Sequence, residues 1–200
     1  MHFIKYNLSW YKIADRNFLR IIREKSAGEI LNMYSKLQDE YNPNHSTRMW
    51  FLAFDMAKKF NFTDEAANAV SEAASYHDLG FLCYPIKDII FRKKQLENHY
   101  ILGSALADIV VSENPRENEY SSLIPEIIKM QKKYEIAPEG SFLRVSAEIV
   151  AVASAIEDIT TGILTAQEKE KSLDFLLKQM CKYESFVFNA LKLYSIKSQI

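Results

Sequence analysis

The sequence predicts an all-α fold of about eight helices in a single domain. Its 200 residues include only 5 Gly and 5 Pro, which is sparse for a β-sandwich or barrel because those folds need many tight turns. Apolar residues make up 48% of the chain, enough for a sizeable core. Apolar side chains recur at helical spacing, and no segment alternates with a period of two for long.

The first three helices are predicted from spacing and from residues typical of helix starts. Apolar positions three or four apart indicate helices at roughly 9–25 and 28–40. A third helix follows at once. Asn42 or Asn44 can cap it, and Pro43 is tolerated in a first helical turn.

The fourth predicted helix has the clearest signals in the chain. Thr63 caps it, acidic residues follow directly, alanine is abundant and Gly80 lies just beyond its end. The pair His77-Asp78 falls on its last turn. Burying an imidazole beside a carboxylate costs free energy unless a partner compensates, so this pair is the first candidate for a functional site.

The remaining helices complete the predicted domain. One helix spans 93–111, a second spans 119–135 with a break at a proline, a third spans 142–162, and one or two closing helices span 167–195. The domain therefore divides into N-terminal helices (1–40), a core (41–165) and C-terminal helices (166–200).

Charge and cysteine content exclude several classes of protein. The 25 Lys and Arg nearly balance the 26 Asp and Glu, so no nucleic-acid partner is expected. The two cysteines, Cys83 and Cys181, give no disulfide framework. No signal peptide and no apolar run of about 18 residues is present. We therefore expect no membrane association and a cytoplasmic location.

Three histidines are candidate metal ligands. His45, His77 and His99 lie on three different predicted helices, and Asp78 adds a carboxylate. Imidazole suits Zn, Fe, Ni and Cu, while a carboxylate adds affinity for Mn or Mg. Side chains on facing helices of a bundle can converge on one ion. A single histidine on an apolar helix is more often a satisfied core or surface residue, so the prediction depends on the combined pattern.

Four ordered segments carry a resemblance to a known family. They read HSTRM at 45–49, HDLGFLCYP at 77–85, HYILG at 99–103 and AVASAIEDIT at 151–160. The stretch from about 41 to 165 resembles the HD superfamily of metal-dependent phosphohydrolases, and within it the HD-GYP branch. The resemblance implies an HD-domain helical bundle and hydrolysis of a phosphoester, with cyclic di-GMP as the family's substrate.

The resemblance also implies roles for individual residues. His45, His77, Asp78 and His99 would hold a divalent transition metal (Fe, Mn or Zn). Asp78 would be the catalytic residue, orienting the water that attacks phosphorus.

Several positions depart from the family pattern. The acidic residue expected one turn before the first histidine is Tyr41, and the lysine after the His-Asp motif is Phe81. A His-His pair is replaced by Gln131-Lys132, and the aspartate that closes the first metal site is Ser154. The G-Y-P loop is missing. The chain is therefore expected to hold one ion, or none, rather than two or three.

Two carboxylates could compensate for the lost aspartate. Glu157 and Asp158 lie three and four residues after Ser154, on roughly the same helix face one turn further on. Either could replace it only if the helix were shifted, and the family pattern places a non-ligand acid at Glu157.

Two cations are candidates for binding substrate. Arg48 could hold a phosphate oxygen, or form a salt bridge to a carboxylate such as Asp55 or Glu72. Lys132 could place its ammonium near the cavity, as a partner of Asp78, or lie on a solvated helix face.

Two functions remain open. The first is a divergent HD-GYP-like metal-binding domain with a partial metal site and reduced or lost phosphodiesterase activity, serving in signalling. The alternative is an active metal-dependent phosphohydrolase that acts on a nucleotide or phosphate ester. A homodimer through the first or last helices is a further expectation.

Overall fold

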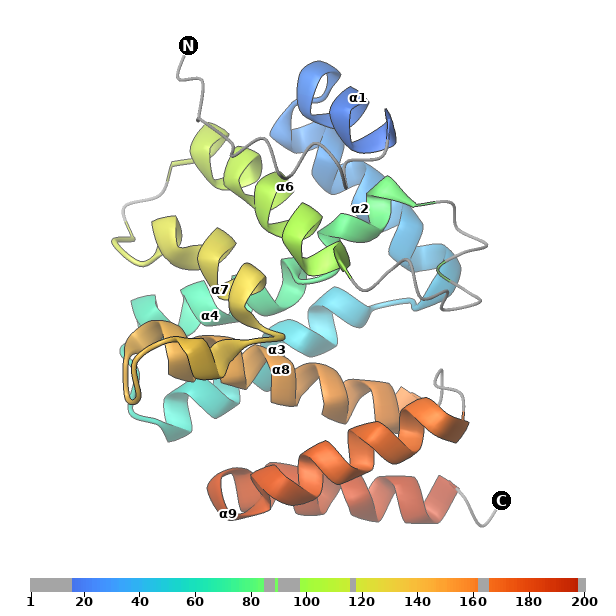
Figure 1. Cartoon of the computed structure of the whole chain (residues 1–200), viewed down its shortest axis with the longest axis vertical. Helices are drawn as coiled ribbons and strands as arrows, with labels where there is room; N and C mark the ends of the chain where they lie inside the picture. Colours follow the sequence, from blue (N-terminus) through green and yellow to red (C-terminus); the bar gives the residue numbers. More distant parts are fainter. Residues whose placement is uncertain (1–15, 85–88, 90–97, 116–117, 162–165, 198–200) are drawn as a thin grey trace.

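The computed structural model describes residues 16–84, 89, 98–115, 118–161 and 166–197. Within these ranges the chain forms eight α-helices and no strand, so the all-α prediction is confirmed (Figure 1). The helices are α1 (Arg16–Glu24), α2 (Ala27–Tyr41), α3 (His45–Lys59), α4 (Asp64–Tyr76), α6 (His99–Glu113), α7 (Ile124–Met130), α8 (Phe142–Thr161) and α9 (Ala166–Lys197). Short 3-10 segments are η2 (Leu79–Cys83), η4 (Ser121–Leu123) and η5 (Tyr134–Ile136).

The helices surround one apolar core to which each of the eight contributes. Helix α3 packs against α4 and α8, while α6 packs against α2, α7 and η2. Helix α9 packs against α8 and lies at the bottom of Figure 1, below α3 and α8. No helix in the described ranges is both long enough and apolar enough to cross a membrane.

The helix starts show which capping predictions were correct. Thr63 caps α4, because its side chain accepts a hydrogen bond from the backbone N–H of Ala66. At α3 the expected cap is absent. Asn44 occupies the N-cap position with a left-handed backbone (φ 61°) and makes no side-chain capping bond, and Pro43 lies before the helix. Asn42 ends α2, and its side chain is used elsewhere.

Two glycines let η2 approach α6 closely. A Cβ atom added to Gly80 would lie 1.8 Å from the backbone oxygen of His99, and one added to Gly103 would lie 3.0 Å from the backbone nitrogen of Gly80. Only glycine permits such backbone contact. This contact places the first turn of α6 beside the His77-Asp78 pair.

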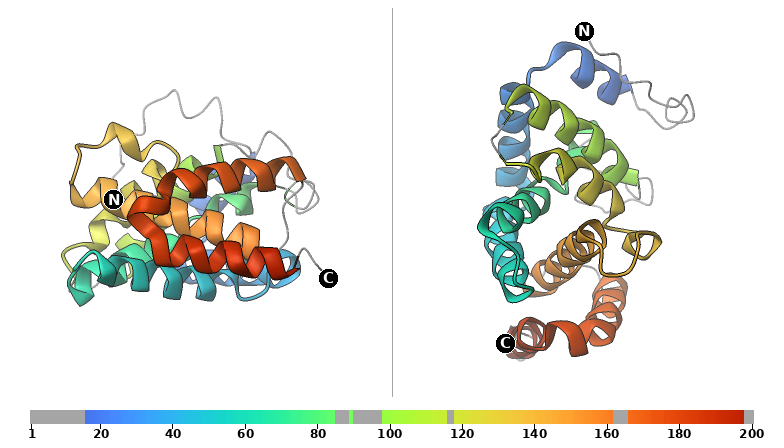
Figure 2. Two further views of the ribbon diagram at one scale, coloured as in Figure 1. Left: turned by 90° about the horizontal axis from the view of Figure 1, so that it is seen from below. Right: turned by 90° about the vertical axis from the view of Figure 1, so that its left-hand side faces the viewer.

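The last helix consists of two arms. The helical backbone geometry is interrupted at Tyr183 (φ −122°, ψ 31°), and Figure 2 shows the two arms of α9 meeting at an angle. This agrees with the prediction of one or two closing helices. The predicted helical residues 9–15 and 93–97, and Gly162 at the expected end of α8, lie outside the described residues.

Candidate metal centre

The four predicted ligands come together where helices end. His45 is the first residue of α3, and His77 is the C-cap of α4. Asp78 follows as the N-cap of η2, so it lies just beyond α4 rather than on its last turn. His99 is the first residue of α6. The starts of α3 and α6 and the link between α4 and η2 therefore supply the four predicted ligands.

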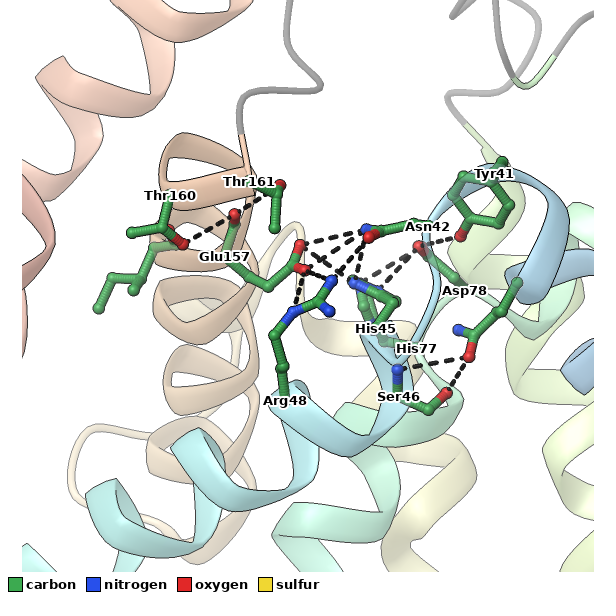
Figure 3. Close-up of polar contacts among 12 residues, drawn as sticks. Tyr41, Asn42, His45, Ser46, Arg48, His77, Asp78, Glu157, Thr160 and Thr161 are labelled. Atoms are coloured by element: carbon green, nitrogen blue, oxygen red, sulfur yellow. Dashed lines mark hydrogen bonds and ion pairs between the residues drawn. The ribbon is translucent and has the colours of Figure 1, made fainter. Parts of the chain in front are cut away.

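Asp78 lies at the centre of the cluster. Its Oδ1 is 3.3 Å from Nε2 of His77 and 3.3 Å from Nε2 of His99. Its Oδ2 is 3.4 Å from Nε2 of His45 and accepts a hydrogen bond of 3.2 Å from the Tyr41 hydroxyl (Figure 3). One carboxylate therefore contacts three imidazoles and a phenol.

Three of these residues form a set that could hold a metal ion. His45, His77 and Asp78 each offer an atom within 4.8 Å of the others, and all three residues are buried. His99 contacts Asp78 but lies outside this mutually close set. Two imidazoles and a carboxylate are the donor set of many zinc and non-haem iron sites, and His99 is next to it.

In His45 and His77, the outer ring nitrogen, Nδ1, faces away from Asp78 and lies close to an oxygen atom of the protein. Nδ1 of His77 lies 2.7 Å from the carbonyl oxygen of Ala74, and Nδ1 of His45 lies 3.1 Å from Oε2 of Glu157. Metal-binding histidines typically donate this second N–H to a carbonyl or carboxylate. In addition, Nε2 of His45 is buried without a hydrogen-bond partner. The residues present therefore suit a cation placed between the two Nε2 atoms and Asp78.

A second group of residues surrounds Glu157 behind His45. Arg48 donates from Nε to Oε1 of Glu157 over 3.0 Å, from Nη2 to Oδ1 of Asn42 over 2.6 Å and from Nη1 to the backbone oxygen of Pro43 over 2.6 Å. The prediction that Arg48 forms a salt bridge is therefore confirmed. Its partner in this salt bridge is Glu157, which differs from the two carboxylates suggested, Asp55 and Glu72. All three guanidinium nitrogens are engaged, which weakens the phosphate-binding interpretation.

Burial and charge shift the pKa values of the site residues. Burial lowers the pKa of His45, but contacts with Asp78 and Glu157 outweigh it and raise that pKa to about 9. Burial lowers the pKa of His77 to about 4. Burial opposes ionisation of Asp78, yet the neighbouring histidines hold its pKa well below the usual range.

Sequence reasoning missed several residues of the site. Tyr41 and Phe81 stand out in the sequence only as departures from the family pattern, but Tyr41 binds Asp78 and the Phe81 ring lies 4.5 Å from that of His99. Gln131, at the position of the lost His-His pair, is buried and donates to the backbone oxygen of His77 over 3.4 Å. Asn42, a predicted cap, instead contacts His45. The only sequence signal for these residues is their place in or near the family's motif positions.

The remaining residues considered for the site, Lys132, Ser154 and Asp158, are not buried. Lys132 is exposed in the turn after α7, while the ion-pair partners of Asp78 within the described ranges are the three histidines. The role of Lys132 in substrate binding stays a prediction. Ser154 and Asp158 are partly exposed on α8. Glu157, on the same helix, is buried and contacts Nδ1 of His45, on the side of the ring opposite Asp78.

Comparisons with known proteins add no relative. No protein-family model matches this sequence, and searches of curated proteins and of solved structures returned no match either. The HD resemblance therefore stays a prediction from the sequence, and any function proposed for the chain depends on the geometry of the four ligands and their partners.

Proposed function

We propose that this chain is a divergent HD-type domain that binds one divalent transition metal ion. The ligands are Nε2 of His45, Nε2 of His77 and the carboxylate of Asp78, with His99 as the adjacent fourth donor. One observation carries the proposal: a buried 2-His-1-carboxylate set in which the outer nitrogen of each imidazole has a protein acceptor. Zn, Fe and Mn are the metals that this donor set suits.

The residues around the set support reduced or lost phosphodiesterase activity. Only one carboxylate belongs to the mutually close donors, which is too little anionic charge to hold two cations near each other. The family's further ligand positions are Gln131, which binds a backbone carbonyl, and Ser154. Arg48 is occupied by Glu157 and Asn42. A role in binding, as in a signalling domain, fits these contacts better than rapid turnover.

Metal analysis of the purified protein tests the proposal. The wild-type chain is expected to bind about one equivalent of Zn, Mn or Fe, and His77→Ala combined with Asp78→Ala should abolish this. Asp39→Ala, an exposed carboxylate on α2, is the matched control and should bind as the wild type does. A wild-type protein that stays metal-free after reconstitution with all three metals contradicts the proposal.

A second candidate function is a working phosphohydrolase on a nucleotide or phosphate ester. It is favoured by the exposure of the set: the side chains of Asp78 and His99 are 11% and 12% exposed, against 3–4% for His45 and His77. A bound divalent cation supplies Lewis-acid polarisation of a phosphoryl oxygen and activation of water. Asp78, at the more open side, would orient that water by accepting a hydrogen bond.

Turnover assays separate the two candidates. The protein, loaded with Mn or Fe, is incubated with cyclic di-GMP, bis(4-nitrophenyl) phosphate and 4-nitrophenyl phosphate. The main proposal predicts no turnover above that of the His77→Ala, Asp78→Ala variant. Turnover that is lost in this variant and kept in Asp39→Ala would establish the second candidate instead.

A further inference from the structure

We infer that Glu157 is the positioning residue of the metal centre, because it fixes the tautomer of His45 that presents an unprotonated Nε2 to the ion. This inference rests on the proposed metal-binding function. Glu157 acts through His45, from the side of the ring opposite Asp78, and is not itself a ligand.

The contacts of Glu157 hold its carboxylate in one orientation. The side chain is 3% exposed, and its Oε1 accepts from Nε and Nη2 of Arg48. Its Oε2 lies 3.1 Å from Nδ1 of His45. At the end of α8 the Thr161 hydroxyl donates to the backbone oxygen of Glu157 over 2.8 Å (Figure 3), and the Thr160 hydroxyl lies between that oxygen (3.1 Å) and the backbone oxygen of Ile156 (2.9 Å).

Two neighbours compete for Nδ1 of His45. Besides Glu157, the side-chain nitrogen of Asn42 lies 3.1 Å from Nδ1. The orientation of this amide is fixed because its oxygen accepts from Arg48 over 2.6 Å. If Asn42 donated to Nδ1, the neutral ring would carry its proton on Nε2 and could not bind a metal there.

The charge of Glu157 decides this competition. A carboxylate only accepts hydrogen bonds, so Nδ1 must donate to it, and the amide of Asn42 then donates to the carboxylate oxygens, each 3.4 Å away. The proton that His45 gives up when it becomes neutral, or when a cation replaces it, is then the one on Nε2, which lies 3.4 Å from Asp78, against 3.1 Å for the contact between Nδ1 and Glu157. Arg48 thus orients the Glu157 carboxylate, and Glu157 keeps a proton on Nδ1 of His45, so that Nε2 is the nitrogen available to a cation.

The isosteric substitution Glu157→Gln tests the inference sharply. Because Arg48 requires an oxygen acceptor, the new amide would place its nitrogen against Nδ1 of His45 and force the proton to Nε2. We expect zinc or manganese affinity to fall about 10- to 100-fold, the range typical for residues that orient metal ligands. Asp158→Asn, one residue further along α8, should leave the affinity unchanged.

The tautomer is read directly by long-range ¹H–¹⁵N NMR of the metal-free protein above pH 9. We expect the Nδ1–H form of His45 in the wild type and the Nε2–H form in Glu157→Gln. Adding Asn42→Asp to Glu157→Gln returns an acceptor to Nδ1, and should restore both the Nδ1–H form and metal affinity. The double variant conserves total charge and side-chain size.

The outcomes separate this inference from the proposed function. A wild-type protein without metal affinity overturns the proposed function, whatever the tautomer. Normal metal affinity in the wild type, with the same affinity and the same His45 tautomer in Glu157→Gln, overturns the positioning role alone. An equal loss of affinity in Asp158→Asn also overturns it, since that result would indicate a general effect of charge on α8.

Discussion

At the scale of single residues, two buried histidines of the site have pKa values shifted in opposite directions because their neighbours differ. Both His45 and His77 are buried, but His45 faces Asp78 on one side and Glu157 on the other. His77 has a backbone carbonyl at Nδ1 instead of a second carboxylate. The pKa of His45 therefore rises to about 9, while that of His77 falls to about 4.

These opposite shifts predict a maximum of stability near pH 6.5 for the metal-free protein. Folded His45 keeps its proton up to about pH 9 and the unfolded residue only to about 6.5, so this stabilisation is lost as pH rises between these values. Folded His77 takes up no proton until about pH 4, so stability also falls as pH decreases from 6.5. Each effect is on the order of 3 kcal/mol at its full extent.

Urea denaturation of the chelator-treated protein from pH 5 to pH 9 measures this profile. His45→Gln should remove the loss on the alkaline side and leave the acid side in place. A wild-type profile that is flat between pH 6.5 and 9 would contradict the charge environment described for His45.

Part of the site was predictable residue by residue, and part was not. The four predicted ligands occupy short segments that follow one another along the chain in the order of the family pattern. These residues, His45, His77, Asp78 and His99, do lie close together. The partner of Arg48 was not predicted, because Glu157 lies 109 positions away and helical spacing relates residues only within one helix. Asn42 was one of two residues, with Asn44, that local sequence suggested as a helix cap. Its contacts with His45 and Arg48 depend on tertiary structure, which local sequence does not show.

At the scale of elements, the site depends on the contact between η2 and α6. Gly80 and Gly103 bring the two backbones together, and this places His99 within reach of Asp78. The sequence indicated Gly80 as a helix stop. Its role in a close backbone contact required knowledge of which element lies opposite.

Gly80→Ala is expected to disturb both the fold and the site. The new methyl group would lie 1.8 Å from a backbone oxygen, so α6 must shift. We expect a loss of about 1–3 kcal/mol in the free energy of unfolding, typical of overpacking, together with weaker metal binding. Gly28→Ala, where an added Cβ meets nothing within 4 Å, should be neutral or slightly stabilising. Equal behaviour of the two variants in urea denaturation would argue against the close contact.

Helix α8 allows a test of its register against the family pattern. Ser154 lies one turn before Glu157 on roughly the same face. If it occupies the position of the lost aspartate, Ser154→Asp adds an anionic donor, and we expect zinc affinity to rise at least about tenfold, since a charged ligand replaces a weak one. Competition with a chelator measures this, with Ser154→Asn as the uncharged control of similar size. An unchanged affinity would place Ser154 outside the reach of the ion.

At the scale of the whole molecule, the proposed ligands connect elements that are separate in the chain. His45 begins α3, His77 ends α4 and His99 begins α6, while Glu157 joins α8 to the same cluster. The all-α class followed from composition and periodicity. The convergence of α3, α4 and α6 was predicted from the family resemblance, whereas the contact that Glu157 of α8 makes with His45 was not predicted. It depends on packing between segments as far apart as residues 45 and 157.

Metal binding should therefore stabilise the fold as a unit. A ligand that binds only the folded state adds about 2.7 kcal/mol at a free concentration 100 times its dissociation constant. For a chain of this size that corresponds to a rise in Tm of about 5–10 °C. Thermal unfolding with and without zinc measures the rise, which should vanish in His77→Ala combined with Asp78→Ala. A similar rise in that variant would mean that zinc binds elsewhere.

The contacts of Asp78 and Glu157 have a consequence for the order of folding and metal binding. Without an ion, the negative charges of these two residues are balanced by Arg48 and by the proton that His45 retains below about pH 9. The chain can thus reach its native state first and exchange that proton for a cation afterwards, unlike small zinc modules that collapse only around their ion. If the proposed site works in this way, removal of the ion would leave a folded chain in which His45 is protonated again and the site is ready to bind the next cation.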